Sequence, residues 1–249
     1  MLTLTVGGQA GAGGPEVGLM LARHLNARYV RHLAVRRLAR RLDATVDAVS
    51  RKELSFSNRW QRVIATLETA FLTMGYYSYD PAGVLASAGA YADLPGTRTS
   101  PGEISDGEYV KAVYETAAEL ASEGNVVLVK RAGSLTLKRF PEVVNVGLFA
   151  RRDARVARMA KRLGVGMADA TDALAALERA RQAWFVRLGG GDPADPRTYD
   201  VCLQTDWAET DSRVAWRGIE MVRELRPAAA LAAMRLRPSP LVEEHPAYA

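Results

Sequence analysis

A glycine-rich run near the start of the chain has the spacing of a loop that binds phosphate. Residues 8–13 read Gly-Gln-Ala-Gly-Ala-Gly, which matches the first six positions of the pattern G-x-x-x-x-G-K-[ST]. Glycines allow consecutive backbone amides to turn inward around an anion, and a helix that begins there adds partial positive charge. We therefore expect a phosphate loop here. A tight strand-to-helix turn that binds nothing is the alternative.

The two residues after this run depart from the pattern. Gly14 stands where the lysine belongs, and Pro15 stands where serine or threonine belongs. The lysine would reach the β- and γ-phosphates, and the hydroxyl would bind Mg²⁺. No basic residue lies between Met1 and Arg23. Backbone amides are therefore the only evident means by which this segment could hold a phosphate.

Basic residues follow other predicted strands. Lys130 and Arg131 come directly after the apolar run Val126–Val129, and a basic helix at 151–163 follows a strand at 143–149. Ligands of parallel α/β proteins bind beyond the carboxyl ends of the strands. The sequence therefore places these side chains and the glycine loop near one crevice. For the basic helix, a solvated charged face is the alternative.

Alternating strands and helices must position these residues. Strands are predicted at 2–6, 27–30, 126–129, 143–149 and 199–205. Helices are predicted at 17–25, 31–42, 44–75, 106–123, 134–140, 151–163, 167–187 and 211–225, with a loop-like stretch at 75–107 and a Pro/Ala-rich tail at 226–249. This alternation predicts a three-layer α/β fold with a mostly parallel sheet.

The composition is that of an ordinary globular protein with a basic balance. The 249 residues carry a formal net charge of +5, and most of the basic residues are arginines, which suit phosphate-bearing ligands. A single cysteine, Cys202, excludes an internal disulfide and a cysteine metal cluster. We find no secretory signal, no apolar stretch of roughly 20 residues and no nucleic-acid-binding motif. The expectation is a cytoplasmic protein with no membrane or nucleic-acid partner; the oligomeric state is open.

Five blocks of the sequence stand in the order of a known family. They are GAGGPEVG at 11–18, NVVLVKRAG at 125–133, NVGLFARRDARVARMAKRLG at 145–164, ERARQAWF at 178–185 and DPRTYDVCLQT at 195–205. Over about residues 2–222 the chain resembles the cytidylate kinase-like family, a branch of the P-loop nucleoside monophosphate kinases. That family typically has glycine in the lysine position of the loop.

The resemblance implies a P-loop kinase-like fold with a helical lid. It implies one kinase-like domain at 1–225, with a lid-like region at about 151–192 and an acceptor-side insertion at about 44–105. The tail at 226–249 would be peripheral.

The resemblance also implies roles for individual residues. Arg131 would contact the acceptor phosphate or the transferred group, and Arg181 would close over the phosphates as a lid arginine. Arg155 and Arg158 would lie near the donor base and phosphates. The loop would bind the donor phosphates through the backbone amides of Gly8, Gln9, Ala10, Gly11, Ala12, Gly13 and Gly14. For Arg181, a structural pair with Glu178 on the same helix is the alternative.

The implied cofactors are ATP and Mg²⁺, and the sequence identifies no protein ligand for the metal. Asp153, Asp200 and Glu16 are acids in the matched region, but their spacing does not select among them. Glu16 is also favoured in a first helical turn by the helix dipole alone. Lys130 replaces a family glycine, and we hypothesise that it supplies the missing positive charge from another strand.

Three functions fit these residues. The first is a nucleotide kinase that transfers the γ-phosphoryl of ATP to a pyrimidine nucleoside monophosphate. The second is a catalytically degenerate relative that binds a nucleotide or another phosphate ligand in a regulatory or interaction role. The third is a kinase of the same fold that acts on another small acceptor. The family favours activity, whereas the loss of the hydroxyl residue at Pro15 favours degeneration.

Overall fold

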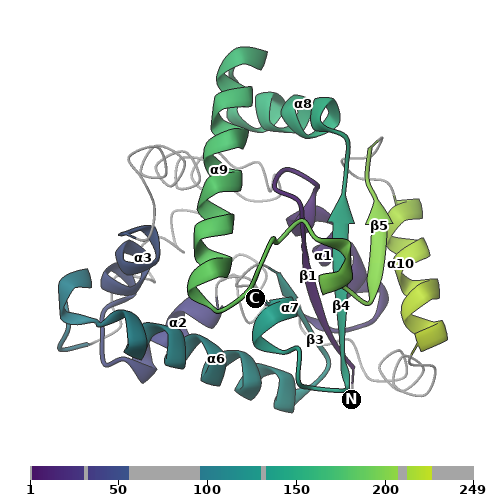
Figure 1. The fold of residues 1–249 in the computed structure, drawn as a ribbon. Helices are drawn as coiled ribbons and strands as arrows, with labels where there is room; N and C mark the ends of the chain where they lie inside the picture. The colour runs from purple at the N-terminus through teal and green to yellow at the C-terminus, as the bar shows by residue number, and fades with distance from the viewer. Residues whose placement is uncertain (1, 31–32, 56–95, 130–132, 207–211, 226–249) are drawn as a thin grey trace, which may run out of the picture.

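A five-stranded sheet forms the centre of the computed structural model, which describes residues 2–30, 33–55, 96–129, 133–206 and 212–225 (Figure 1). The strand order is β2-β3-β1-β4-β5, and every pairing is parallel. The strands are β1 (Thr3–Gly8), β2 (Arg28–Val30), β3 (Val126–Val129), β4 (Val143–Phe149) and β5 (Val201–Gln204). The prediction of an α/β fold with a mostly parallel sheet is confirmed.

The strands are apolar because helices cover both faces of the sheet. In β3, Val127 and Val129 belong to one hydrophobic cluster, and Val126 and Leu128 belong to another. Alternate residues of a strand point to opposite faces, so this run is buried on both sides. The run Val126–Val129 thus builds two halves of the core at once.

Three layers result from this burial. Helices α1 (Gly14–His24) and α10 (Ser212–Leu225) pack together on one face of the sheet. Helices α6 (Asp106–Glu123) and α7 (Gly133–Thr136) pack on the other face. The helix predicted at 134–140 is shorter than expected, because α7 ends at Thr136 and turns follow.

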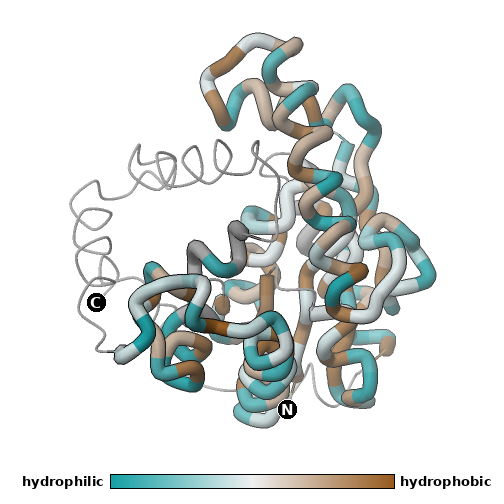
Figure 2. Tube along the Cα trace, turned by 60° about the vertical axis from the view of Figure 1, so that its left-hand side comes forward, coloured by the Kyte–Doolittle hydropathy of each residue, from teal (hydrophilic) through white to brown (hydrophobic). Residues whose placement is uncertain are grey.

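A pair of helices extends beyond the carboxyl end of the sheet. Helix α8 (Arg152–Leu163) follows β4 and lies across the top of Figure 1, and α9 (Met167–Arg187) returns from it beside the sheet. Figure 2 shows hydrophilic and hydrophobic residues alternating along this hairpin. Its apolar residues, including Met159 and Leu174, form a small core with Ala10 of the glycine loop. The predicted helices at 151–163 and 167–187 are confirmed.

A third group of helices packs against α6 beside the sheet. It comprises α2 (Leu33–Arg41) and α3 (Val46–Ser55), with the short helix η1 (Pro101–Glu103) close to α3. Helix η2 (Pro196–Thr198) precedes β5. The helix predicted at 44–75 is described only as α3, and the other residues of the acceptor-side insertion up to 95 lie outside the described residues. The same holds for the tail at 226–249.

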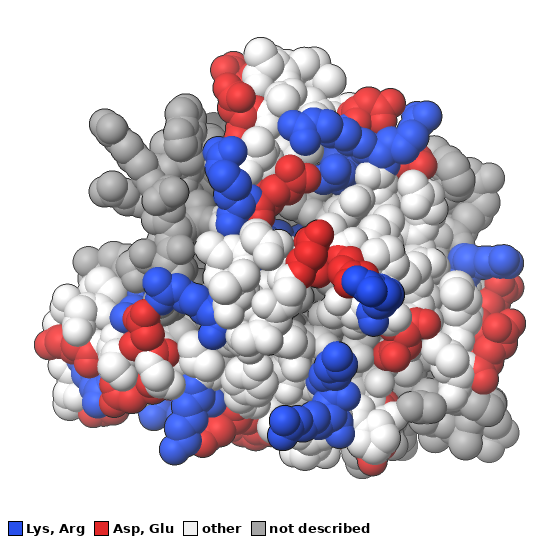
Figure 3. Space-filling view, in the orientation of Figure 1, with Lys and Arg blue, Asp and Glu red and all other residues white. Residues whose placement is uncertain are grey.

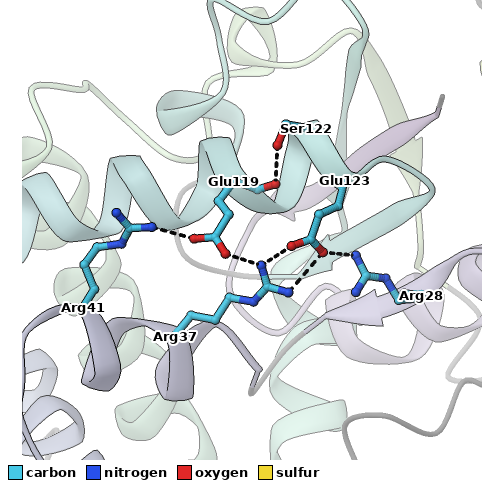
Figure 4. A network of polar contacts seen from close by, with 6 residues as sticks. All are labelled: Arg28, Arg37, Arg41, Glu119, Ser122 and Glu123. Atoms are coloured by element: carbon cyan, nitrogen blue, oxygen red, sulfur yellow. Dashed lines mark hydrogen bonds and ion pairs between the residues drawn. The ribbon is translucent and has the colours of Figure 1, made fainter.

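Ion pairs join α2 to α6 on the solvent side (Figure 4). Arg37 lies between Glu119 and Glu123, and it contacts Glu119 at 2.7 Å. Arg41 pairs with Glu115 at 3.0 Å and also with Glu119. The basic stretch at 31–42 thus has, in its described part, a structural partner in the acidic face of α6.

No helix among the described residues is long and apolar enough to cross a membrane. The division into one domain at 1–225 with a lid-like region at 151–192 stays a prediction.

Candidate functional site

The glycine run occupies the turn between β1 and α1, at the carboxyl end of a central strand. Gly8, Gly11 and Gly13 all have positive φ, a conformation that residues with a Cβ rarely adopt. At Gly8, a Cβ would also lie 2.1 Å from the carbonyl oxygen of Leu148. The predicted strand at 2–6 extends to Gly8, and the helix predicted to start at Val17 begins at Gly14. Backbone geometry therefore accounts for the glycines of this run.

The amides of this loop divide into two sets. Gly8 N donates to the phenol oxygen of Tyr199 at 2.9 Å, and Gln9 N donates to Leu148 O at 2.8 Å. Ala12 N donates to Gln9 O at 3.2 Å. The expectation that all seven loop residues offer amides to a phosphate is therefore too broad, because these three amides already have protein acceptors.

The second set consists of amides without an acceptor in the part of the chain that the structure describes. These are the amides of Ala10, Gly11, Gly13 and Gly14. Gly13 is the N-cap of α1, and no side chain caps this end of the helix. A helix N-terminus carries partial positive charge from its unpaired amides. These four amides are the anion-binding donors that the loop has available.

Arg155 and Arg158, both buried on α8, contact the carbonyl side of the loop. Arg155 Nη1 donates to Ala10 O at 3.2 Å, and its Nε donates to Ala150 O at 3.0 Å. Arg158 Nη1 donates to Gly11 O at 3.2 Å. The two side chains are thus close to the loop, where they bind its backbone carbonyl groups, and Arg155 also pairs with the carboxylate of Glu178. A direct contact of either one with a nucleotide stays a prediction.

Arg181 lines a pocket of about 540 Å³ beside the loop. The pocket is bounded by Gly8, Gln9 and Ala10 on one side, by Glu178, Arg181 and Gln182 of α9 on another, and by the segment 192–194. Arg181 makes no hydrogen bond or ion pair with any residue that the structure describes. Burial lowers the pKa of its guanidinium, and the nearby Tyr199 and Glu178 oppose that shift only in part.

Glu178 is not the partner of Arg181 that the alternative interpretation required. Its carboxylate pairs with Arg155 and lies 3.8 Å from Arg152. Arg181 is therefore a partly buried cation that forms no ion pair with a described residue, although Glu178 attracts it at longer range, and it lies next to a loop with unused amides. That combination fits a ligand that brings negative charge.

The basic surface over α8 is visible in Figure 3, where Lys and Arg side chains gather at the top of the molecule with carboxylates among them. Some of these charges are paired: Arg162 pairs with Glu16, and Arg151 lies 3.4 Å from Asp153. The expectation that part of this helix is a solvated or paired basic face is consistent with these contacts.

Lys130 and Arg131 lie outside the described residues, so their roles stay predictions. The strand that precedes them, β3, is described: its last residue, Val129, lies opposite Val6 of β1 in the parallel register.

Two contacts of the loop were not singled out from the sequence. Tyr199 accepts from Gly8 N, and Thr205 donates from its hydroxyl to Ala12 O at 2.8 Å. Both residues belong to the block at 195–205 that carries the family resemblance. The signal was therefore present in the sequence, but no spacing rule links that block to a loop some 190 residues earlier.

The parallel sheet, its helical layers and the glycine-rich turn between β1 and α1 define a P-loop kinase-like α/β protein. The sequence profile of the cytidylate kinase-like family matches residues 3–207, and the chain belongs to that family. No match to a curated protein reaches significance.

Several solved structures are similar to this chain, among them these two. An uncharacterized protein from Eubacterium ventriosum ATCC 27560 is 16% identical with a TM-score of 0.56, and the match covers 91% of this chain and 100% of that one. The likeness is one of fold. A shikimate kinase from Bacteroides thetaiotaomicron is 14% identical with a TM-score of 0.42, and that match covers 90% of this chain and 97% of that one.

Proposed function

We propose that this protein is a phosphotransferase that moves the γ-phosphoryl group of ATP to a pyrimidine nucleoside monophosphate. Membership of the cytidylate kinase-like family supports the reaction class. The observation that carries the proposal is that unused loop amides occur beside Arg181, a cation that forms no ion pair with a described residue and shares a pocket with Ala10.

These groups suit phosphoryl transfer. An oxygen of the acceptor phosphate would attack the γ-phosphorus while the bond to the β–γ bridging oxygen breaks and ADP leaves. The protein's contribution to such a step is positioning and stabilisation of charge on the phosphoryl oxygens. The amides of Gly11, Gly13 and Gly14 would hold donor phosphates. Arg181 would neutralise charge from α9, and Arg131 would do so from the end of β3.

Mg²⁺ would arrive bound to the nucleotide. This ion takes oxygen ligands and often draws several of them from substrate phosphates and water, with one or two carboxylates from the protein. The described residues contain no cluster of three metal-ligating side chains. Glu16, near the loop, has one oxygen paired with Arg162 and one buried oxygen without a hydrogen-bond partner among the described residues. Glu16 is therefore the described carboxylate that fits the ion best.

A degenerate binding protein is the second candidate, and the loop sequence favours it. Gly14 and Pro15 remove the lysine and the hydroxyl that usually support catalysis. Loss of one preorganised charge donor typically costs about 3–4 kcal/mol of transition-state stabilisation. Arg181, with Lys130 as a second source of charge, would have to offset that loss for turnover to occur.

The experiment is a turnover screen of the full chain with ATP, Mg²⁺ and a panel of nucleoside monophosphates, in which ADP and the new diphosphate are separated and quantified. A diphosphate formed from CMP or UMP, and not formed by the Arg181→Gln protein, supports the proposal. Binding of ATP without any product selects the degenerate candidate. Product from a purine or a non-nucleotide acceptor selects a kinase with another substrate.

A further inference from the structure

Side chains from outside the loop bind three consecutive carbonyl groups of the phosphate loop. Arg155 donates to Ala10 O and Arg158 donates to Gly11 O, each at 3.2 Å. The hydroxyl of Thr205, just after β5, donates to Ala12 O at 2.8 Å. Thr205 is 0% exposed, so water does not compete for this hydrogen bond.

A carbonyl that is held in place also fixes the direction of an amide. The described peptide bonds are all trans, and in a trans peptide the carbonyl and the following N–H point in opposite directions. Because Arg155 binds Ala10 O, the N–H of Gly11 points to the opposite side of that peptide, away from Arg155. Because Thr205 binds Ala12 O, the N–H of Gly13 likewise points away from Thr205. Both amides belong to the set without a described acceptor.

We propose that Thr205 is a positioning residue for the phosphate site, and that Arg155 acts in the same way at Ala10, two residues earlier in the loop. Each holds a carbonyl away from the ligand, and each thereby aims one amide at it. This inference rests on the proposed function, because it assumes that the loop binds phosphate. It explains how a loop without its lysine keeps ordered donors: the orientation comes from the buried side chains of Arg155 on α8 and of Thr205, just after β5.

The alternative is that Thr205 only stabilises the fold. Loss of its hydroxyl would leave Ala12 O without that partner and would lower stability in either case. A measurement of stability therefore cannot separate the two roles, whereas anion affinity and the environment of one amide can.

The test compares Thr205→Val, which keeps the shape and removes the hydroxyl, with Thr205→Ser, which keeps the hydroxyl. Thr116→Val is the matched control, because Thr116 is equally buried and its hydroxyl has no hydrogen-bond partner among the described residues. Binding of pyrophosphate and of MgATP is measured by calorimetry well below the unfolding temperature. The Gly13 amide is followed by ¹H–¹⁵N spectroscopy in the free proteins.

We expect Thr205→Val to weaken binding of both probes by about tenfold, the equivalent of one hydrogen bond that orients the donor. The Gly13 amide resonance should also move in the free Thr205→Val protein. Thr205→Ser should stay within about threefold of the wild type, and Thr116→Val should bind as the wild type does. If Thr205→Val does not fold, Arg155→Met takes its place, with the same loss of affinity and a shift of the Gly11 amide.

The outcomes separate this inference from the proposed function. A wild-type protein that binds neither pyrophosphate nor MgATP overturns both. A wild-type protein that binds, together with a Thr205→Val or Arg155→Met protein that binds equally well, overturns the positioning role alone. A movement of the Gly13 resonance without loss of affinity also contradicts it.

Discussion

The phenol of Tyr199 closes the start of the phosphate loop by accepting a hydrogen bond from Gly8 N at 2.9 Å. The phenol proton is donated to Pro193 O at 2.7 Å, and the ring packs against Gly7 and Gly147. Gly8 and Pro193 both line the pocket that contains Arg181. One side chain therefore ties the end of β1 to the opposite wall of the proposed site.

Tyr199→Phe removes both hydrogen bonds and keeps the ring. We expect the free energy of unfolding to fall by about 1–3 kcal/mol, because a buried amide donor loses its acceptor. Affinity for pyrophosphate should fall as well. Tyr114→Phe is the control: its phenol donates to Leu188 O at 2.8 Å, away from the loop, so it should lose stability and keep anion affinity. Urea unfolding and calorimetry measure the two quantities; equal affinities for both variants would contradict the role of Tyr199.

Arg181→Gln should separate binding from stability. Burial disfavours the charged guanidinium in the folded state more than the nearby Tyr199 and Glu178 favour it, and no described residue forms an ion pair with it. Its removal should therefore leave the free energy of unfolding unchanged or raise it. Affinity for MgATP should fall by at least about tenfold. Arg187→Gln on the same helix is the control, because Arg187 pairs with Asp106 outside the pocket. An Arg181→Gln protein that is less stable and binds normally would contradict the assignment.

The ion pairs between α2 and α6 should be structural only. The hydrogen bond between Arg37 and Glu123 raises the pKa of Arg37 and lowers the pKa of Glu123. Arg37→Gln should lower the free energy of unfolding by about 1 kcal/mol, by less in 1 M salt, and should leave MgATP affinity unchanged. The exposed pair of Arg217 and Glu220 provides the control, since Arg217→Gln should have no measurable effect. A loss of stability that does not depend on salt would contradict this account.

Glu108 should make stability depend on pH at the acidic end. Its carboxylate accepts hydrogen bonds from Ser105 at the start of α6 and pairs with Arg98, which together lower its pKa to about 2. Because the pKa is lower in the folded than in the unfolded state, the contribution is complete above the ordinary value of 4.5 and is lost as the pH falls toward 2. Unfolding of the wild type and Glu108→Gln between pH 2 and pH 6 should show a difference that shrinks with falling pH. A constant difference would show that the carboxylate charge plays no part.

The sequence alone was sufficient to predict the fold class and most helices and strands. The continuous apolar run Val126–Val129 and the helix signals around 151–187 left few alternatives, since burial on two faces and a 3.6-residue period each leave a clear pattern. The glycine loop was found because its pattern is local. The end of the loop is predicted less accurately. The helix expected from Val17 begins at Gly14, because Pro15 is compatible with a first helical turn.

The contacts that shape the site could not be predicted in the same way. Which loop amides have acceptors depends on Tyr199, which follows η2, and on Leu148 of β4, and only the folded chain brings these two residues beside the loop. The same holds for Arg155, which contacts Glu178 and Ala10 O because α8 packs against the loop. The sequence around a charged residue on a basic helix does not show which partner its side chain contacts.

The most direct test of the central claim is the response of the loop amides to MgATP in ¹H–¹⁵N spectra of the wild-type protein. If the unused amides bind the donor phosphates, those of Ala10, Gly11, Gly13 and Gly14 should show large, saturable shifts. Gly8, Gln9 and Ala12, whose amides already donate to protein acceptors, should show smaller shifts. Saturation without shifts in the first set, or shifts confined to residues far from the loop, would contradict this claim.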